Sequence, residues 1–264
     1  MEYCYLNGEL IREADCKLHI SDLQIQRGYG VFDFFRCRDG AIPWLEDYQK
    51  RLFTSIQLAG IENPLNQEEF QGIIHELQER NGGFRGAFKI IVTGGNSSTL
   101  EGVTGPATVI IMQVGWNPHP EENFEKGVNL VSDEFVRPNP KVKSLYYFNS
   151  LRLRQKLKEQ QAVDVLYHKG TVSECSRANL FWVQDGRFFT PASNILEGIT
   201  RKQVMKLAGA VSLRDPDLNE LLDADEVFIT STSRDITPVV NIDGRSIGNG
   251  IPGKQTLQLM QAFH

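Results

Sequence analysis

A polar stretch with two prolines in the middle of the chain is the feature that most constrains the fold. Residues 115–123 contain Pro118 and Pro120, few apolar residues and several charges, and they divide a chain of 264 residues. Such a composition is typical of a linker between domains. The sequence therefore predicts an N-terminal α+β domain over residues 1–114, a linker over 115–123 and a C-terminal α/β domain over 124–264.

Apolar segments on both sides of this linker mix short strands with helices in no regular order. Asn7-Gly8 marks a hairpin, and the apolar residues of 45–59 recur at helical spacing. Further helices are expected over 67–80, 145–158, 200–208 and 254–262, and strands over 31–37, 88–93, 107–114, 128–131, 163–167, 180–183, 226–230 and 236–240. This is an α+β pattern, and neither a dinucleotide fingerprint nor a Walker motif accompanies it.

Charge and cysteine usage narrow the class of protein. The net charge is −5 with no extended basic block, so the sequence gives no sign of nucleic-acid binding. No apolar run reaches the roughly 20 residues that a membrane span needs. Residues 1–4 lack the basic and apolar regions of a secretory signal, and Cys4, Cys16, Cys37 and Cys175 lack metal-site spacing. We therefore expect a cytoplasmic protein with reduced thiols and no bound metal.

Four segments in the second half carry a more specific signal. Val142 to Asn149 (VKSLYYFN), Val172 to Phe181 (VSECSRANLF), Leu196 to Arg201 (LEGITR) and Ser231 to Val239 (STSRDITPV) follow one another in the chain. In this order they resemble the lysine segment, the glutamate segment and the two phosphate turns of fold-type IV aminotransferases, which depend on pyridoxal phosphate. The resemblance runs from about Gly28 to the C-terminus and implies a two-domain fold with the cofactor at the domain junction.

Lys143 and Glu174 would carry the central chemistry. A lysine that attacks an aldehyde must be near neutral, so it needs partial desolvation or a cationic neighbour. Without the resemblance, Lys143 would be interpreted as an ordinary solvated lysine and Glu174 as a surface turn residue. The resemblance implies that Lys143, in the C-terminal domain, is the catalytic residue and holds the cofactor covalently. It also implies that Glu174 keeps the pyridine nitrogen protonated, so that the ring acts as an electron sink.

The remaining cofactor contacts would come from helix and turn positions. Gly198, Ile199 and Thr200 open a helix, where exposed N–H groups attract phosphate, although a plain capped helix start fits the local sequence equally well. Arg51 flanks an apolar helix face and could reach a phosphate or lie on the surface. By the resemblance, Leu196 packs on the ring and Tyr147 approaches its phenolic oxygen. The implied cofactor-binding set is Arg51, Lys143, Tyr147, Glu174, Leu196, Gly198, Ile199, Thr200, Thr232 and Ser233.

The substrate pocket departs from the better-known subgroups. The branched-chain subgroup carries Tyr-x-Arg at the strand aligned with Ala87-Phe88-Lys89. The D-alanine subgroup carries a tyrosine at the position of Phe32 and an Arg-x-His that is absent from residues 94–99. An α-carboxylate still needs a cationic partner, although each available cation could instead form a structural salt bridge. The candidate substrate-binding residues are Lys89 and Arg27, ranked first, followed by Arg36 and Arg177, with Phe32 in the same pocket.

The resemblance leaves the reaction partly open. We expect a transaminase that moves an amino group between an amino acid and a 2-oxo acid by ping-pong kinetics, with a D-amino acid or a branched-chain L-amino acid as substrate. Aminodeoxychorismate lyase is the alternative, because Glu174 to Trp182 is similar to its glutamate segment. Phe34 lacks the hydroxyl that the lyase subgroup places near this position. A non-catalytic cofactor-binding protein is a further alternative, which the presence of Lys143 and Glu174 disfavours. The family also implies a homodimer.

Overall fold

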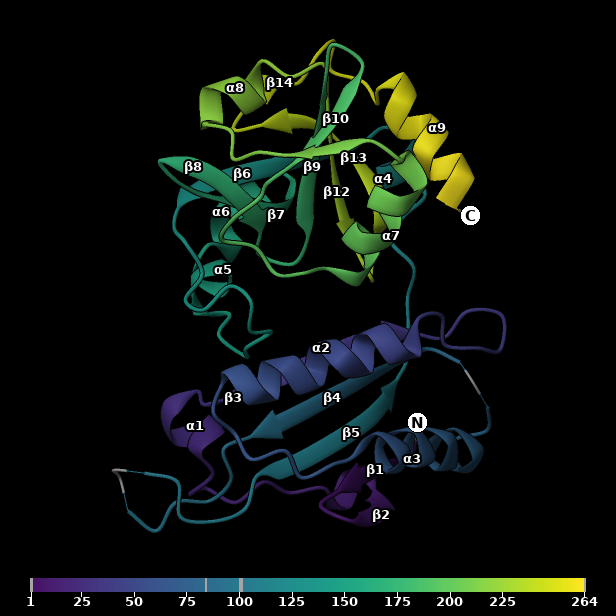
Figure 1. The fold of residues 1–264 in the computed structure, drawn as a ribbon, viewed down its shortest axis with the longest axis vertical. Helices are drawn as coiled ribbons and strands as arrows, with labels where there is room; N and C mark the ends of the chain where they lie inside the picture. The colour runs from purple at the N-terminus through teal and green to yellow at the C-terminus, as the bar shows by residue number, and fades with distance from the viewer. Residues whose placement is uncertain (1, 84, 100–101, 264) are drawn as a thin grey trace. The chain divides into compact units, whose positions relative to one another are not determined.

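The computed structural model describes residues 2–83, 85–99 and 102–263 (Figure 1). These residues form two compact units. The first unit extends to Asn117 and also contains Val142–Tyr146, and the second contains Pro118–Lys141 and the chain from Tyr147 onward. The chain first passes between the units within the segment expected to be a linker, and it returns to the first unit for Val142–Tyr146. However, Lys143, which the sequence assigned to the C-terminal domain, clusters with the first unit.

The first unit is built on an antiparallel sheet. Within the described residues this sheet has five strands in the order β2-β1-β5-β4-β3. The strands are β1 (Tyr3–Leu6), β2 (Glu9–Arg12), β3 (Gly30–Arg36), β4 (Ala87–Thr93) and β5 (Thr108–Val114). Asn7 and Gly8 form the β1–β2 turn with positive φ angles, as an Asn-Gly hairpin requires. Strand β3 therefore lies at one end of the strand order.

Three α-helices belong to the described part of this unit: α1 (Leu23–Arg27), α2 (Leu45–Leu58) and α3 (Gln67–Arg80). Helix α2 packs on β3, whereas α3 packs on β1 and β5 (Figure 1). Leu52 and Ile56 of α2 are fully buried, which confirms the apolar face expected from their spacing. Asn66 caps the start of α3: its side chain accepts from the Glu69 N–H, while the Glu69 side chain accepts from the Asn66 N–H. This capping box fixes the helix start from local sequence alone.

The prediction of one helix over residues 145–158 was wrong in two respects: the helical part starts later, and it is interrupted. The structure has two short helices there, α5 (Phe148–Arg152) and α6 (Arg154–Glu159). Leu145 is not helical, because its N–H donates to the Gly30 carbonyl at the edge of β3. Phe148 and Leu151 of α5 are 68% and 61% exposed. Tertiary pairing with β3 therefore overrides the helical pattern of this segment.

The second unit contains a larger mixed sheet. Within the described residues its strands follow the order β11-β10-β9-β12-β13-β6-β7-β8, and β14 pairs with β13. Strand β6 runs parallel to β13 on one side and to β7 on the other. The strands are β6 (Val128–Glu134), β7 (Ala162–Lys169), β8 (Thr171–Cys175), β9 (Asn179–Gln184), β10 (Arg187–Thr190), β11 (Val211–Leu213), β12 (Glu226–Ser231), β13 (Asp235–Ile242) and β14 (Arg245–Ser246).

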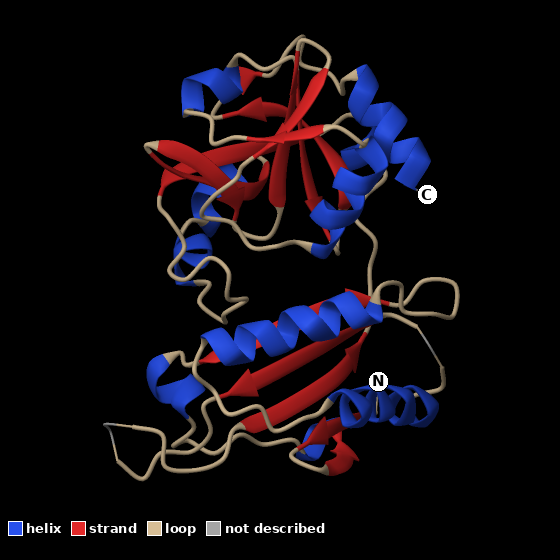
Figure 2. Cartoon of the chain, viewed as in Figure 1, coloured by secondary structure: helices blue, strands red, loops and turns tan. Residues whose placement is uncertain are grey.

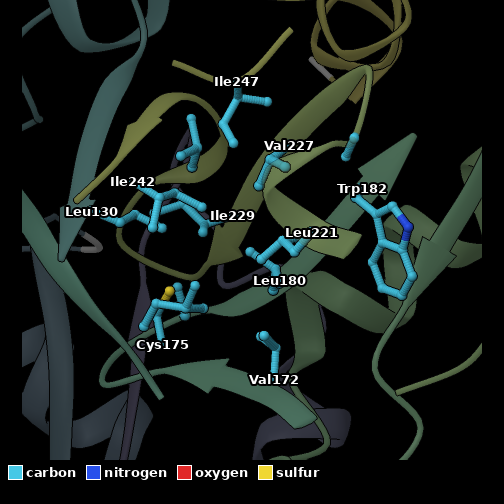
Figure 3. Packing of buried hydrophobic residues seen from close by; sticks show 14 of the residues in the cluster. Leu130, Val172, Cys175, Leu180, Trp182, Leu221, Val227, Ile229, Ile242 and Ile247 are labelled. Carbon is cyan, nitrogen blue, oxygen red and sulfur yellow. The ribbon is translucent and has the colours of Figure 1, made fainter. Parts of the chain in front are cut away.

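The sheet of the second unit curves around its own core. Val172 of β8, Leu180 of β9, Ile229 of β12 and Leu130 of β6 belong to one buried cluster, although their strands are spread across the strand order (Figure 3). Helices α7 (Ile199–Ala208) and α9 (Lys254–Phe263) pack together and cover β12 (Figure 2). Two short helices complete the unit, α4 (Glu122–Glu125) and α8 (Leu218–Leu222). None of the described helices is long and apolar enough to cross a membrane.

Candidate functional site

The peptide group of Lys143 is held from both sides within the first unit. Its N–H donates to Ser55 Oγ at 3.1 Å, and its carbonyl accepts from the Phe32 N–H at 2.9 Å. Ser144 forms an isolated bridge with Val31, so the segment around Lys143 pairs with β3. Ser55 is fully buried on α2. The helix and the sheet therefore fix the backbone of Lys143 together.

The side chain of Lys143 lies over an aromatic ring. Its Nζ is 4.6 Å from the centroid of the Phe32 ring, and Nζ of Lys89 is 5.9 Å from the same centroid. Phe32 is buried, whereas both lysines are half-buried. A ring face attracts an ammonium group at these distances. The structure thus brings three of the expected residues together, two of them lysines.

Arg51 forms a close ion pair in the same unit. Its Nε and Nη2 donate to the two carboxylate oxygens of Asp33 at 2.9 and 2.6 Å, and its Cζ lies 5.3 Å from the Tyr48 ring centroid. Only 10% of the Arg51 side chain and 1% of the Asp33 side chain is exposed. A guanidinium has five N–H donors, so this pair orients the group without using all of them. Arg51 and Ser55 lie one turn apart on α2.

The Glu174 carboxylate contacts several polar groups of the second unit. It is buried at the end of β8, with Oε1 2.7 Å from Nη2 of Arg137. Its Oε2 accepts from the Leu196 N–H at 2.9 Å and lies 3.4 Å from Nδ2 of Asn179. The Arg137 side chain is only 7% exposed, so water screens this pair little. Sequence reasoning missed Arg137, because a single arginine between β6 and a proline pair has no periodicity or motif to mark it.

The turn at Gly198 is tightly packed. Helix α7 begins after Gly198, where the structure gives no side-chain cap, and Thr200 in its first turn is buried. A Cβ on Gly198 would lie 1.9 Å from Oδ1 of Asn179. Asn179 is itself fixed, because its Nδ2 donates to the Leu196 carbonyl at 2.8 Å. The turn therefore requires glycine, and the N–H groups of a first helical turn are suited to an anion.

The second turn joins β12 to β13. Ser231 pairs with Asp235, and Thr232 and Ser233 lie half-buried in the loop between them. Thr230 is the strand partner of Asn179, which contacts the first turn. Both turns and Glu174 therefore lie at the same end of the sheet in the second unit. This end gathers hydroxyl, N–H and carboxylate groups from segments far apart in the sequence.

Tyr147 belongs to the second unit, at the start of α5. Burial raises the pKa of its phenol, and Arg137, Asp164 and Glu174 are among the charges that act on it. The phenol therefore keeps its proton at neutral pH and is a donor. Its charged neighbours include both members of the buried Arg137–Glu174 pair.

The other basic candidates have separate partners. Arg36 Cζ lies 5.0 Å from the Trp116 ring centroid. Arg177 donates to the Val163 carbonyl at 2.9 Å, and Arg27 is exposed and donates to the Gln26 carbonyl at 2.9 Å. Lys89 is the candidate that shares the Phe32 ring with Lys143.

Comparison with known proteins gives a consistent result. The family model described as Amino-transferase class IV matches residues 30–242. A putative branched-chain-amino-acid aminotransferase of Methanocaldococcus jannaschii is 33% identical over 98% of this chain and 94% of its own length. A D-alanine aminotransferase of Listeria monocytogenes is 30% identical over 98% and 93%.

Solved structures agree with these sequence matches. A branched-chain amino acid aminotransferase of Escherichia coli superposes with a TM-score of 0.91 at 27% identity, covering 99% of this chain and 93% of that one. A second such enzyme, from Thermobaculum terrenum and solved in its PLP-form, gives a TM-score of 0.85 at 26% identity and covers 99% and 92%.

Proposed function

Because this chain belongs to the class IV aminotransferase family, we propose that it exchanges an amino group between a D-amino acid or a branched-chain L-amino acid and a 2-oxo acid. The family match over residues 30–242 confirms the resemblance carried by the four segments. The relatives' names support both substrate classes. The observation that carries the proposal is the double anchoring of the Lys143 peptide in a chain of this family.

The residues present fit pyridoxal phosphate as the cofactor. The second unit offers an uncapped helix start at Gly198, the hydroxyls of Thr200, Thr232 and Ser233, and a buried carboxylate at Glu174. This donor set suits a phosphate at one end and a protonated ring nitrogen at the other. When bound, the cofactor supplies an aldehyde that accepts the amino group and a ring that withdraws electrons.

Each residue then has a defined task. We propose that Lys143 Nζ would take up the proton from the substrate α-carbon and later give it back. Glu174 would accept the ring N–H of the cofactor, with Arg137 neutralising and orienting its carboxylate. Tyr147 would donate to the phenolic oxygen, and Leu196 would pack on the ring. Arg51 and the N–H groups at Ile199 and Thr200, with Thr232 and Ser233, would bind the phosphate.

The substrate carboxylate needs a cation near the reacting carbon. We propose Lys89 first, since it faces the same Phe32 ring as Lys143, and Arg27 second. Arg36 and Arg177 rank lower because their side chains contact Trp116 and Val163 respectively.

We also propose a cytoplasmic homodimer. Phe148 and Leu151 expose apolar side chains on α5, and a second subunit would cover such residues. Sedimentation equilibrium at several concentrations tests this, and a monomer throughout would contradict it.

Two lysines close together in the chain allow a matched test of the mechanism. Lys143→Ala should abolish the near-visible absorbance of the imine between Lys143 and the cofactor and reduce turnover by about 10²–10⁴-fold or more. Lys141→Ala, at an exposed position, should preserve both. Equal absorbance and turnover in the two variants would refute the role of Lys143.

A panel of half-reactions tests the substrate. D-alanine, D-glutamate, L-leucine and aminodeoxychorismate are each added to the holoenzyme, and the cofactor spectrum is followed. A spectral change with D-amino acids alone selects the D-specific reaction. Release of pyruvate and para-aminobenzoate from aminodeoxychorismate selects the lyase instead.

A further inference from the structure

A fully buried carboxylate on β7 has no part in the chemistry proposed above. Asp164 has no exposed surface, and an unpaired charge in such a place would be costly. Its Oδ1 accepts from Ser176 Oγ at 2.5 Å and from the Val165 N–H at 2.8 Å. Its Oδ2 accepts from Arg234 Nη1 at 2.6 Å. Every one of these contacts lies within the second unit.

Arg234 connects this carboxylate to the second phosphate turn. It follows Thr232 and Ser233 directly, and its N–H donates to the Ser231 carbonyl at 3.2 Å. Its side chain is 6% exposed and reaches β7, where Nη2 donates to the Val163 carbonyl at 3.0 Å. The guanidinium therefore binds β7 at two points, while the backbone of the same residue shapes the turn.

Ser176 connects the same carboxylate to the glutamate segment. It lies two positions after Glu174, and its N–H donates to the Val165 carbonyl at 2.9 Å. In the sheet, β13 and β6 lie between β12 and β7. The turn after β12 and the loop after β8 thus belong to separate parts of the sheet, and Asp164 contacts both through side chains.

The Asp164–Arg234 ion pair is suited to hold β7 and the 231–233 turn rigidly together. Burial by itself would raise the pKa of Asp164, but Arg234, Arg177 and the Ser176 hydroxyl hold it below its ordinary value. The carboxylate is therefore ionised at neutral pH. Arg177 is a weaker partner, with its Nε 3.8 Å from Oδ2 and half of its side chain exposed.

We propose that the Asp164–Arg234 ion pair is a positioning device that sets the 231–233 turn in register with Glu174. Asp164 and Arg234 are positioning residues, because they act through the groups proposed to touch the cofactor. This inference rests on the proposed function, in which the turn binds the phosphate and Glu174 binds the ring nitrogen. Its consequence is that the phosphate's contribution to cofactor affinity depends on the ion pair.

Comparing pyridoxal phosphate with pyridoxal, which lacks the phosphate, measures this contribution directly. Both are titrated into the apoprotein, and the ratio of their dissociation constants is obtained for each variant. Asp164→Asn removes the charge but keeps hydrogen-bonding capacity. Arg234→Lys keeps the charge, so that Asp164 stays paired and the protein folds, but it loses the two-point contact with β7. Arg245→Gln, in an exposed ion pair with Asp223, is the control.

We expect Asp164→Asn and Arg234→Lys to lower the preference for pyridoxal phosphate by about tenfold, and the control to leave it within about twofold. Pyridoxal affinity should change little in all three. An unchanged preference in Arg234→Lys, or an equal loss of both affinities, would overturn the inference and leave the proposed function intact. Failure of the wild-type protein to bind pyridoxal phosphate would instead overturn the proposed function itself.

Discussion

Lys143 is held through its peptide group, whereas Glu174 is held through its side chain. The Lys143 N–H and carbonyl bind Ser55 and the backbone of Phe32, and its side chain rests on the Phe32 ring. Glu174 instead depends on a buried arginine and on the Leu196 N–H. A peptide anchor leaves the ε-amine able to change its bonding partner. A buried ion pair instead holds the Glu174 carboxylate in place, but the carboxylate then depends on Arg137 for its countercharge.

The two regions should therefore respond differently to substitution. Loss of one member of a buried ion pair leaves an uncompensated charge, whereas loss of one hydrogen bond to a peptide group is a smaller change.

Arg137→Met should destabilise the protein most, by about 3–5 kcal/mol, because Glu174 would remain buried without its cation. Urea unfolding measures the change, with Arg245→Met as the matched control in an exposed ion pair of the same unit. The control should stay within about 0.5 kcal/mol of wild type. Equal effects of the two substitutions would contradict the importance of burial.

Gly198→Ala should destabilise by about 1–3 kcal/mol through overpacking. The new Cβ would fall 1.9 Å from Oδ1 of Asn179, which the Leu196 carbonyl holds in place. Urea unfolding again measures the change, with Gly170→Ala as the control. Gly170 has a positive φ, but a Cβ there would have no neighbour within 4 Å. A smaller loss at Gly198 than at Gly170 would show that Asn179 yields easily.

Ser55→Ala should cost about 1 kcal/mol, the usual net value of one hydrogen bond. The hydrogen bond from the Phe32 N–H to the Lys143 carbonyl would remain. Thr54→Ala, at the neighbouring exposed position, is the control, since its hydroxyl donates to the Lys50 carbonyl on the same helix. A loss as large as that of Arg137→Met would remove the distinction between the two kinds of anchor.

Acidification should weaken the second unit through Asp164. Its folded pKa is lowered, so its contribution to stability is present above the unfolded value of about 3.9 and is lost as pH falls through the folded value. Thermal unfolding between pH 7 and pH 3 should therefore show a smaller acid-induced decrease for Asp164→Asn than for wild type. Parallel curves for the two proteins would contradict this sign.

Local features of the fold were predictable because neighbouring residues encode them. The hairpin at Asn7-Gly8 and the helix over 67–80 depend on turn and capping chemistry within a few residues. The apolar face around Leu52 and Ile56 follows from spacing alone. The helix expected over 145–158 failed because pairing between Leu145 and Gly30 competes with it, and no local pattern reports a partner so distant in the chain.

The sequence by itself determined the family, the fold class and the cofactor, since four segments in order carry a specific resemblance that the comparisons confirm. Only the tertiary structure decided which groups hold those segments. Ser55 and Lys143 are 88 positions apart, and Asp164 and Arg234 are 70 apart. Such contacts depend on strand order and register, so a single buried arginine or serine has no signal until the chain has folded around it.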